Sequence, residues 1–344
     1  MSKKTKKTYH LSINQVSLSN EAKKFIAKKP YEFVDRNEEN LVSIRSSIRA
    51  SIEPMVRRVI ETYGVQISHE VIEGVSCQVV KPKKTLSDYR ILYGFGGGFV
   101  SGSAFEDLTI AVPISALAEL EVIIPEYKLA PENPWPAACE EFFTVYSSLS
   151  DTLAAIVGES AGGNLALVAL LKAKKLGLKM PKSAVLFSPW CNLKNEGDSL
   201  EFNEGRDPTL SIRQSIAAAD HYASGQDLTN PEISPLFGVF DSTFPKILIS
   251  SGTRDLLLSQ SIQLTSLLRS SGVSVDLRIW EGLWHVFEWN ADLPESIISI
   301  KQITDFLRNS LSSCKQNSPL VNFQSNVEAD NVGVIPLCAF LLLF

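Results

Sequence analysis

A single serine stands between two glycines near the middle of the chain, in the stretch Gly158 to Gly162 (Gly-Glu-Ser-Ala-Gly). An apolar run, Leu153 to Val157, precedes it, and a strong helix-forming stretch, Asn164 to Leu176, follows it. The pattern predicts a strand, a tight turn with Ser160 at its apex, and a helix. The two glycines leave room where a Cβ would clash, so the hydroxyl projects away from the strand, with a helix N-terminus behind it. Such a serine is suited to nucleophilic attack on a carbonyl carbon.

A nucleophilic serine needs a general base. The turn resembles the nucleophile elbow of α/β-hydrolases, and this resemblance implies that the acid and then the histidine follow the serine along the chain. The chain has four histidines, of which His10 and His69 precede the serine. His221 lies in a predicted helix on a face shared with alanines, which favours a structural role. His285 follows the last predicted strand, where the base is required, so we predict it as the general base.

The acid is expected to leave the strand before that one. Residues 246 to 250 form a predicted strand, and Asp255 lies just past its end. An aspartate there is also a common helix N-cap, and the two roles are compatible. Asp241, before the strand, and Asp276, near the start of the next, are the alternatives. We predict that Asp255 orients His285, which then draws the proton from Ser160.

A glycine-rich loop, Tyr93 to Phe99, follows another predicted strand. Consecutive glycines let backbone N–H groups turn toward a substrate oxygen without obstruction by side chains. Together with the Ala161 N–H, they predict an oxyanion hole worth about 3 kcal/mol per donor. A flexible loop is the plain alternative, and a dinucleotide site is excluded because Phe99 stands where that motif needs a glycine.

These residues need a scaffold, which alternating apolar runs provide. Short apolar strands are predicted at 71–72, 77–80, 90–93, 121–124, 153–157, 184–187, 246–250 and 275–280. Helices are predicted within 12–64 and at 108–120, 136–149, 161–176, 258–270 and 294–311. Strands that alternate with helices indicate an α/β fold with a mostly parallel sheet covered on both faces.

Residues 195 to 240 interrupt the alternation with one predicted helix, begun by Asp207-Pro208 and Ser211 and ending near Tyr222. With the N-terminal helices, this insertion is expected to cap the carboxyl edge of the sheet, where open α/β sheets bind ligands. The expected division is a tail and cap helices at 1–64, a catalytic domain at 65–311 and a C-terminal tail at 312–344.

Composition excludes several classes of protein. The 344 residues are 44% hydrophobic and 21% charged, as in an ordinary globular protein, and the net charge of −5 argues against nucleic acid as a partner. The cysteines, Cys77, Cys139, Cys191, Cys314 and Cys338, are scattered and odd in number. This pattern favours buried free thiols in a reducing cytoplasm over disulfides or a zinc site.

The two ends of the chain carry no predicted function. Lysines cluster at 3–7 without an apolar segment behind them, so no secretory signal peptide is expected. The last residues, 332 to 344, are apolar but shorter than the about 20 residues that span a bilayer. No stable membrane span is expected.

The chain resembles the hormone-sensitive-lipase-like branch of the α/β-hydrolases over about residues 65 to 310. The family's motifs His-Gly-Gly-Gly, Gly-Asp-Ser-Ala-Gly-Gly-Asn and Tyr-Arg-Leu-Ala-Pro-Glu correspond here to residues 95–98, 158–164 and 127–132, and the late motifs at 252–256 and 282–287 also match. The resemblance implies an α/β-hydrolase fold with eight strands and a helical cap. It implies Gly97, Gly98 and Ala161 as oxyanion donors. It also implies a carboxylesterase that hydrolyses short acyl esters, with lactones as a further substrate class, without cofactor, and a homodimer through a late edge strand or helix.

One residue departs from the family pattern, since Phe95 stands where the family has a histidine. That histidine is expected to anchor the glycine loop by hydrogen bonds that Phe95 cannot make. Either the loop is less preorganised and activity is lower, or Phe95 repacks. The alternative function is therefore a weak or inactive hydrolase-fold protein that binds a small apolar ligand. Within the enzyme class, the sequence does not separate an esterase from an amidase or a lactonase.

Overall fold

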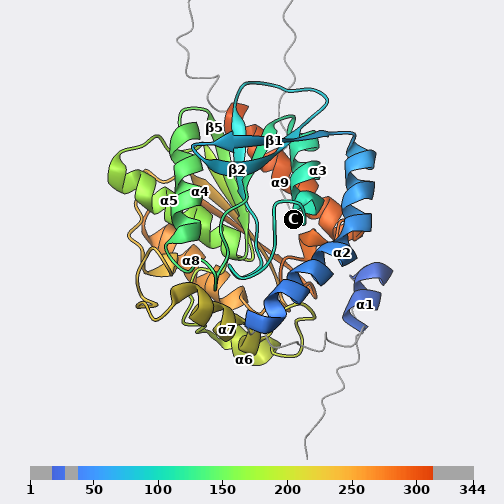
Figure 1. The fold of residues 1–344 in the computed structure, drawn as a ribbon, viewed down its shortest axis with the longest axis vertical. Helices are drawn as coiled ribbons and strands as arrows, with labels where there is room; N and C mark the ends of the chain where they lie inside the picture. The colour runs from blue at the N-terminus through green and yellow to red at the C-terminus, as the bar shows by residue number, and fades with distance from the viewer. Residues whose placement is uncertain (1–17, 28–37, 313–344) are drawn as a thin grey trace, which may run out of the picture.

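The structure is a computed structural model that describes residues 18–27 and 38–312 of the chain. Within these residues, eight strands form one sheet in the order β1-β2-β4-β3-β5-β6-β7-β8. Figure 1 shows the sheet in the middle of the molecule with helices around it. The strands are β1 (Gln66–Ile72), β2 (Val75–Lys81), β3 (Arg90–Gly94), β4 (Glu121–Pro125), β5 (Leu153–Glu159), β6 (Ser183–Phe187), β7 (Lys246–Gly252) and β8 (Val275–Trp280). From β4 to β8 every neighbouring pair is parallel. The predicted mostly parallel α/β sheet is confirmed.

The hairpin at the start of the sheet is its antiparallel part. β1 pairs with β2, and β2 with β4, both antiparallel. Glu73 and Gly74 form the turn with φ of 48° and 83°, a left-handed backbone that suits a tight two-residue hairpin. The sequence predicted strand only at Val71 and Ile72, but β1 begins at Gln66. As a half-exposed edge strand it carries polar residues that hide its period.

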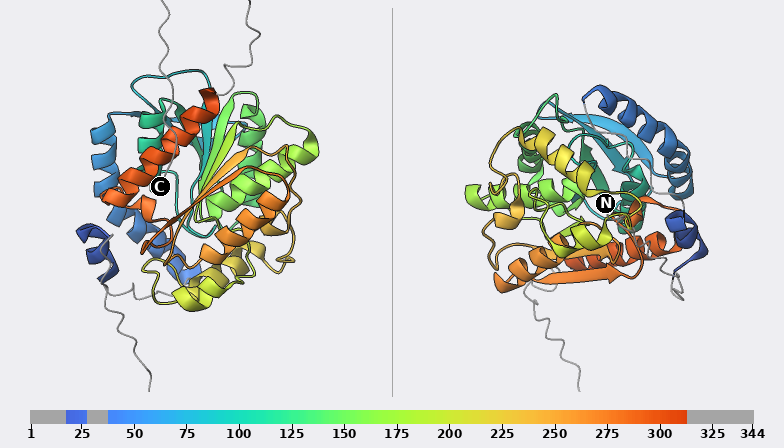
Figure 2. Two further views of the ribbon diagram at one scale, coloured as in Figure 1. Left: turned by 180° about the vertical axis from the view of Figure 1, so that it is seen from behind. Right: turned by 90° about the horizontal axis from the view of Figure 1, so that it is seen from below.

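Helices cover both faces of the sheet, as Figure 2 shows. α3 and α9 pack together on one face with α2 outside α3, whereas α4, α5 and α8 lie on the other face. The helices are α1 (Asn20–Ala27), α2 (Glu38–Tyr63), α3 (Leu108–Ala118), α4 (Ala137–Leu149), α5 (Ala161–Leu176), α6 (Asp198–Asn203), α7 (Ile212–Ala223), α8 (Leu258–Ser270) and α9 (Pro294–Ser312), with short 3₁₀ turns η1 (Pro235–Phe237) and η2 (Phe287–Trp289). β5, the central strand, is buried along its whole length.

Four helices reach the carboxyl edge of the sheet. α6 and α7 lie within the predicted insertion, and Tyr222 of α7 stacks on Phe99 in the loop after β3, with ring centroids 3.7 Å apart. Arg45 of α2 donates to the carbonyl of Val100 in the same loop, at 2.8 Å. Phe25 of α1 stacks on Trp284, which follows β8. These contacts place the cap helices over the loops that carry the predicted site.

Most predicted helices are confirmed within a residue or two, and one helix was not predicted. α7 begins after Ser211, whose hydroxyl accepts the N–H of Gln214 as an N-cap. α6, at Asp198–Asn203, was missed because six residues are too few to show a helical period. The N-terminal lysine cluster, His10, Cys314, Cys338 and the tail from 313 lie outside the described residues.

Candidate active site

The serine turn has the geometry that its glycines predict. Ser160 ends β5 and begins α5 with φ 50° and ψ −115°, a strained backbone that costs of order 1–3 kcal/mol. A Cβ on Gly158 would lie 2.3 Å from the carbonyl oxygen of Gly162, and one on Gly162 would lie 2.0 Å from that of Gly94. Both glycines are therefore required by the close approach of three backbone segments.

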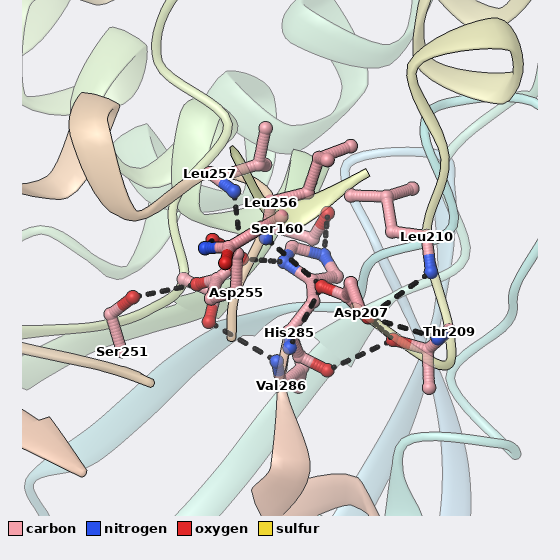
Figure 3. A network of polar contacts seen from close by, with 12 residues as sticks. Ser160, Asp207, Thr209, Leu210, Ser251, Asp255, Leu256, Leu257, His285 and Val286 are labelled. Atoms are coloured by element: carbon pink, nitrogen blue, oxygen red, sulfur yellow. Dashed lines mark hydrogen bonds and ion pairs between the residues drawn. The ribbon is translucent and has the colours of Figure 1, made fainter. Parts of the chain in front are cut away.

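The structure brings the predicted base and acid to this serine. His285 Nε2 lies 3.0 Å from Ser160 Oγ, and His285 Nδ1 lies 3.0 Å from Asp255 Oδ1 (Figure 3). These contacts join residues 125 and 30 positions apart in the chain. The chain of contacts has the order needed to pass a proton from serine to imidazole while a carboxylate faces the other ring nitrogen.

The carboxylate of Asp255 is fully buried and well bonded. Its Oδ2 accepts the hydroxyl of Ser251 at 2.6 Å, and its Oδ1 also accepts the N–H of Leu257 at 2.9 Å. The alternative acids lie elsewhere: Asp241 pairs with Lys174 at the surface, and Asp276 pairs with Arg278. Of the three candidates, only Asp255 contacts His285 in the structure.

The surroundings of Asp255 and His285 favour the ionised carboxylate and the protonated imidazole. Burial disfavours ionisation of Asp255, but the neighbouring His285 and the donated hydrogen bonds outweigh it and lower the pKa of the carboxyl. Burial likewise opposes a charged imidazole, but the charge of Asp255 raises the pKa of His285 above its ordinary value, with smaller contributions from Asp207 and Glu288. A raised pKa makes His285 a stronger proton acceptor.

The glycine loop after β3 curls beside the serine. Gly97 and Gly98 have φ of 105° and 65°, and a Cβ on Gly97 would lie 2.1 Å from the carbonyl oxygen of Ser101. The N–H groups of Val100 and Ser101 both donate to the Gly97 carbonyl, which closes the turn. Among the described residues, the N–H groups of Gly97, Gly98 and Ala161 have no hydrogen-bond acceptor.

Phe95 repacks and does not leave the loop loose. Its side chain is buried and stacks on Tyr127, with ring centroids 4.0 Å apart and planes 5° apart. The Tyr127 hydroxyl donates to the Phe95 carbonyl at 2.6 Å. A stack and a hydrogen bond to the backbone therefore anchor this loop, where the family pattern has a histidine side chain.

A buried pair of acids lies behind the loop, and sequence reasoning missed it. Glu159 and Asp107 hydrogen-bond to each other and to the N–H of Gly96, and Asp107 also accepts the hydroxyl of Tyr93 at 3.0 Å. Burial raises the pKa of Asp107 to about 7 and that of Glu159 well above its usual range, so the pair retains a proton near neutral pH. The one signal in the sequence was a carboxyl side chain beside the serine, inside a buried turn.

Three large aromatic side chains, Trp190, Phe202 and Trp284, follow strands or lie in the insertion and differ in their surroundings. Trp190 is buried, and its ring lies 6.0 Å from that of Phe99. Trp284 is buried against Phe25 of α1. Phe202 is 68% exposed on α6 and belongs to neither the core nor an enclosed pocket.

The cysteines within the described residues are free and buried, as predicted. Burial raises the pKa of Cys77, Cys139 and Cys191 to about 12, which makes these thiols inert. In the described ranges, no group of three His, Cys, Asp or Glu side chains is arranged to hold a metal ion. Across residues 18–27 and 38–312, no helix is both long and apolar enough to cross a bilayer.

The chain is similar to known proteins of the α/β-hydrolase fold. A family model described as alpha/beta hydrolase fold matches residues 91–289. The chain is 30% identical over 271 residues to an esterase of Acinetobacter venetianus, covering 76% of this chain and 88% of that protein. It is also 30% identical over 224 residues to an acetyl-hydrolase of Streptomyces hygroscopicus, covering 63% of this chain and 75% of that protein.

Solved structures give the same result. A hormone-sensitive lipase from a metagenome library superposes with a TM-score of 0.78 at 30% identity, covering 84% of this chain and 98% of that one. An esterase from the bacterial hormone-sensitive lipase family superposes with a TM-score of 0.70 at 27% identity, covering 80% of this chain and 99% of that one.

Proposed function

The chain belongs to the α/β-hydrolase-fold family, among the relatives of hormone-sensitive lipase, and from this premise we propose that it is a serine carboxylesterase that acts through Ser160, His285 and Asp255. Membership makes it a carboxylic ester hydrolase. The proposal adds the reacting residues and the substrate class. The observation that carries it is the unbroken contact chain from Ser160 Oγ through both ring nitrogens of His285 to Asp255.

The reaction proceeds through an acyl-enzyme. Ser160 Oγ attacks the ester carbonyl carbon as its proton passes to His285 Nε2, and the imidazolium that forms is stabilised by Asp255. The same proton then goes to the leaving alcohol oxygen as the C–O bond breaks. Water, deprotonated by His285, attacks the acyl carbon and releases the acid and free Ser160.

The oxyanion that forms at each attack is bound by backbone N–H groups. Gly97, Gly98 and Ala161 are the donors we assign, because their N–H groups have no acceptor within residues 18–27 and 38–312. Gly96 is not one of them, since its N–H is bonded to the acid pair of Asp107 and Glu159. Each donor aimed at the developing charge is worth about 3 kcal/mol.

The substrate is a short-chain ester. Ser160 is buried, with 7% of its surface exposed. The N-terminal helices and residues 195–240 contact the glycine loop of the catalytic domain at 65–311, through Arg45 and Tyr222, and we expect this cap to leave room for a short acyl group. The relative named acetyl-hydrolase supports a small acyl group. Lactones and amides are the alternatives that a substrate screen separates.

Two further parts of the proposal concern the cellular compartment and the oligomeric state. The free buried cysteines favour a reducing compartment, and we place the enzyme in the cytoplasm. β8 is the last strand of the sheet in the described residues, and we assign it to a homodimer contact. Size-exclusion chromatography with light scattering tests the dimer.

The experiment that tests the function is hydrolysis of p-nitrophenyl esters from acetyl to dodecanoyl by the wild type and Ser160→Ala. Ser266→Ala, on the exposed side of α8, is the matched control. We expect turnover to peak at short chains and to fall by about 10⁵-fold or more in Ser160→Ala only. Ester turnover that survives Ser160→Ala would refute the nucleophile. Tight binding of apolar esters without turnover would favour the ligand-binding alternative, for which the repacked Phe95 no longer argues.

A further inference from the structure

Asp207 is a buried acid whose place in the sequence, before Pro208, predicts only the start of a helix. The helix N-cap is Ser211 instead, and Asp207 lies between α6 and α7 with 1% of its surface exposed. Figure 3 shows its carboxylate beside His285, on the side away from Asp255. It reaches the site from the cap, not from the sheet.

One oxygen of this carboxylate joins the two loops that carry the acid and the base. Asp207 Oδ2 accepts the N–H of Leu256 at 3.0 Å and the N–H of His285 at 3.2 Å. Leu256 directly follows Asp255 in the chain. The oxygen therefore fixes the backbone next to the acid and the backbone of the base itself.

The other oxygen ties the carboxylate to its own loop. Asp207 Oδ1 accepts the N–H groups of Thr209 and Leu210 at 2.9 and 3.3 Å. The Thr209 hydroxyl lies 2.9 Å from Oδ1 and 3.3 Å from the His285 carbonyl oxygen. Both carboxylate oxygens are thus fully used, which holds the charge in one position.

α6 supports the same acid loop from one face of its helix. Ser199 Oγ donates to the Leu256 carbonyl at 2.7 Å, and Asn203 Nδ2 donates to the Asp255 carbonyl at 2.8 Å. Ser199, Asn203 and Asp207 are spaced by four residues. The cap therefore contacts the acid loop at three successive points, of which only Asp207 also contacts the base.

The charge of Asp207 also faces the imidazole. Three carboxyl groups act on His285: Asp255 from the loop after β7, Asp207 from the cap and Glu288 from η2. Burial raises the pKa of Asp207 to about 6, so it is ionised at neutral pH. Its negative charge then favours the imidazolium that forms during catalysis.

We propose that Asp207 is a positioning residue, through which the cap sets the distance between Asp255 and His285 and adds charge that favours the protonated base. The inference rests on the proposed function, since it concerns the same reaction. It makes the cap part of the catalytic apparatus and not merely a cover for the substrate.

The test compares Asp207→Asn with Asp227→Asn. Asp227 makes the same local turn in the insertion, accepting the N–H of Thr229 at 2.9 Å, but it is exposed. An asparagine at 207 has one acceptor oxygen, so either the Leu256 and His285 side or the Thr209 side faces an NH₂ group. We expect kcat on p-nitrophenyl acetate to fall about 10- to 100-fold with KM within about twofold, as for an interaction realised in the transition state. Asp227→Asn is expected to keep wild-type kcat.

The pH profile separates positioning from a general loss of structure. Loss of the Asp207 charge lowers the pKa of His285, so the acid limb of kcat/KM moves to lower pH in Asp207→Asn, whereas loss of folded protein lowers the plateau without moving the limb. Wild-type kcat, or a lower plateau with an unmoved limb, would overturn the proposal.

Two further measurements test the proposal if the wild type hydrolyses no ester or if Asp207→Asn does not fold. NMR titration of the His285 imidazole reads the same pKa shift without turnover, so it remains decisive if the wild type hydrolyses no ester and the proposed function fails. If Asp207→Asn does not fold, Thr209→Val, at an exposed position, removes one donor to the carboxylate. We expect it to lower kcat severalfold, and unchanged kcat would count against the proposal.

Discussion

The two halves of the site are held in place by different means. On the oxyanion side, backbones approach so closely that a Cβ on Gly97 or Gly162 would lie about 2 Å from a carbonyl oxygen. On the acid–base side, hydrogen bonds join distant segments, with Asp207 and His285 78 residues apart. A close backbone contact tolerates almost no added side-chain atom, whereas a loop held by several hydrogen bonds can lose one of them and shift only slightly. We therefore expect substitutions on the oxyanion side to cause a large loss of activity at once, and substitutions among the hydrogen-bonded supports on the acid–base side to cause graded losses. The reacting groups themselves are the exception.

Asp255→Asn is expected to have the largest effect. The amide removes the charge that stabilises the imidazolium and favours the wrong tautomer of His285, so kcat should fall by about 10⁴-fold. Steady-state kinetics on a short p-nitrophenyl ester measure it. Asp276→Asn, on β8, is the control, because Asp276 pairs with Arg278 and not with His285. If Asp276→Asn inactivates the enzyme and Asp255→Asn does not, the acid is misassigned.

Gly97→Ala tests the steric side. The new Cβ would meet the Ser101 carbonyl, so the loop must move and the N–H of residue 97 leaves its place; kcat should fall about 10²- to 10³-fold. Gly177→Ala is the matched control, with φ of 68° but no atom within 4 Å of the Cβ. It should lower stability by about 1–2 kcal/mol and leave kcat unchanged. Equal kinetic losses in both variants would show that backbone strain, not contact, sets the requirement.

The same contrast explains how much the sequence could predict. Gly158 and Gly162 are identifiable because a steric requirement selects glycine at a fixed spacing, and Ser160 is identifiable because it stands between them. His285 follows from chain order, which the topology of the sheet imposes. These positions are the ones where local geometry leaves no alternative, and the strands and helices around them follow from hydrophobic period.

The side chains that support the site loops by hydrogen bonds could not be predicted from the sequence, and the reason is physical. Asp207 and Tyr127 act on backbone atoms that are distant in sequence, and a hydrogen bond to a backbone group requires no particular residue type at the other end. Their side chains are also common in turns and cores. Only the folded arrangement shows which carboxylate or hydroxyl reaches which loop.

Tyr127→Phe tests the support of the oxyanion loop. It preserves the ring stack on Phe95 but removes the hydroxyl that donates to the Phe95 carbonyl. An unsatisfied buried carbonyl costs about 1–3 kcal/mol, and if about 1.4 kcal/mol of this is lost from loop alignment, kcat falls tenfold. Tyr146→Phe removes a hydroxyl that bonds the Lys179 carbonyl, away from the site, and should affect melting temperature alone. A kinetic effect of equal size in Tyr146→Phe would contradict this assignment.

The last expected effect concerns pH, on which activity and stability depend in opposite directions. The acid–base side needs ionised Asp255 and neutral His285, so activity should rise as pH rises through the raised pKa of His285. Buried Glu288 has the opposite preference, since burial raises its pKa from 4.5 to about 7. Its folded state binds the proton more tightly than the unfolded state. The stability this gives is complete below pH 4.5 and is lost as pH rises through about 7.

Glu288→Gln should remove the loss of stability at rising pH without disturbing the fold. One carboxylate oxygen, Oε1, accepts the hydroxyls of Ser250 and Ser299, which a glutamine oxygen can do as well. Oε2 has no hydrogen-bond partner among the residues that the structure describes, so an NH₂ group can replace it. We expect the variant to gain roughly 2 kcal/mol over the wild type between pH 5 and pH 8, measured by thermal melting across that range. Glu201→Gln, on the exposed side of α6, is the control. Parallel melting curves for wild type and Glu288→Gln would show that this carboxyl titrates alike in the folded and unfolded states, and the opposition between activity and stability would then have to come from the acid pair of Asp107 and Glu159.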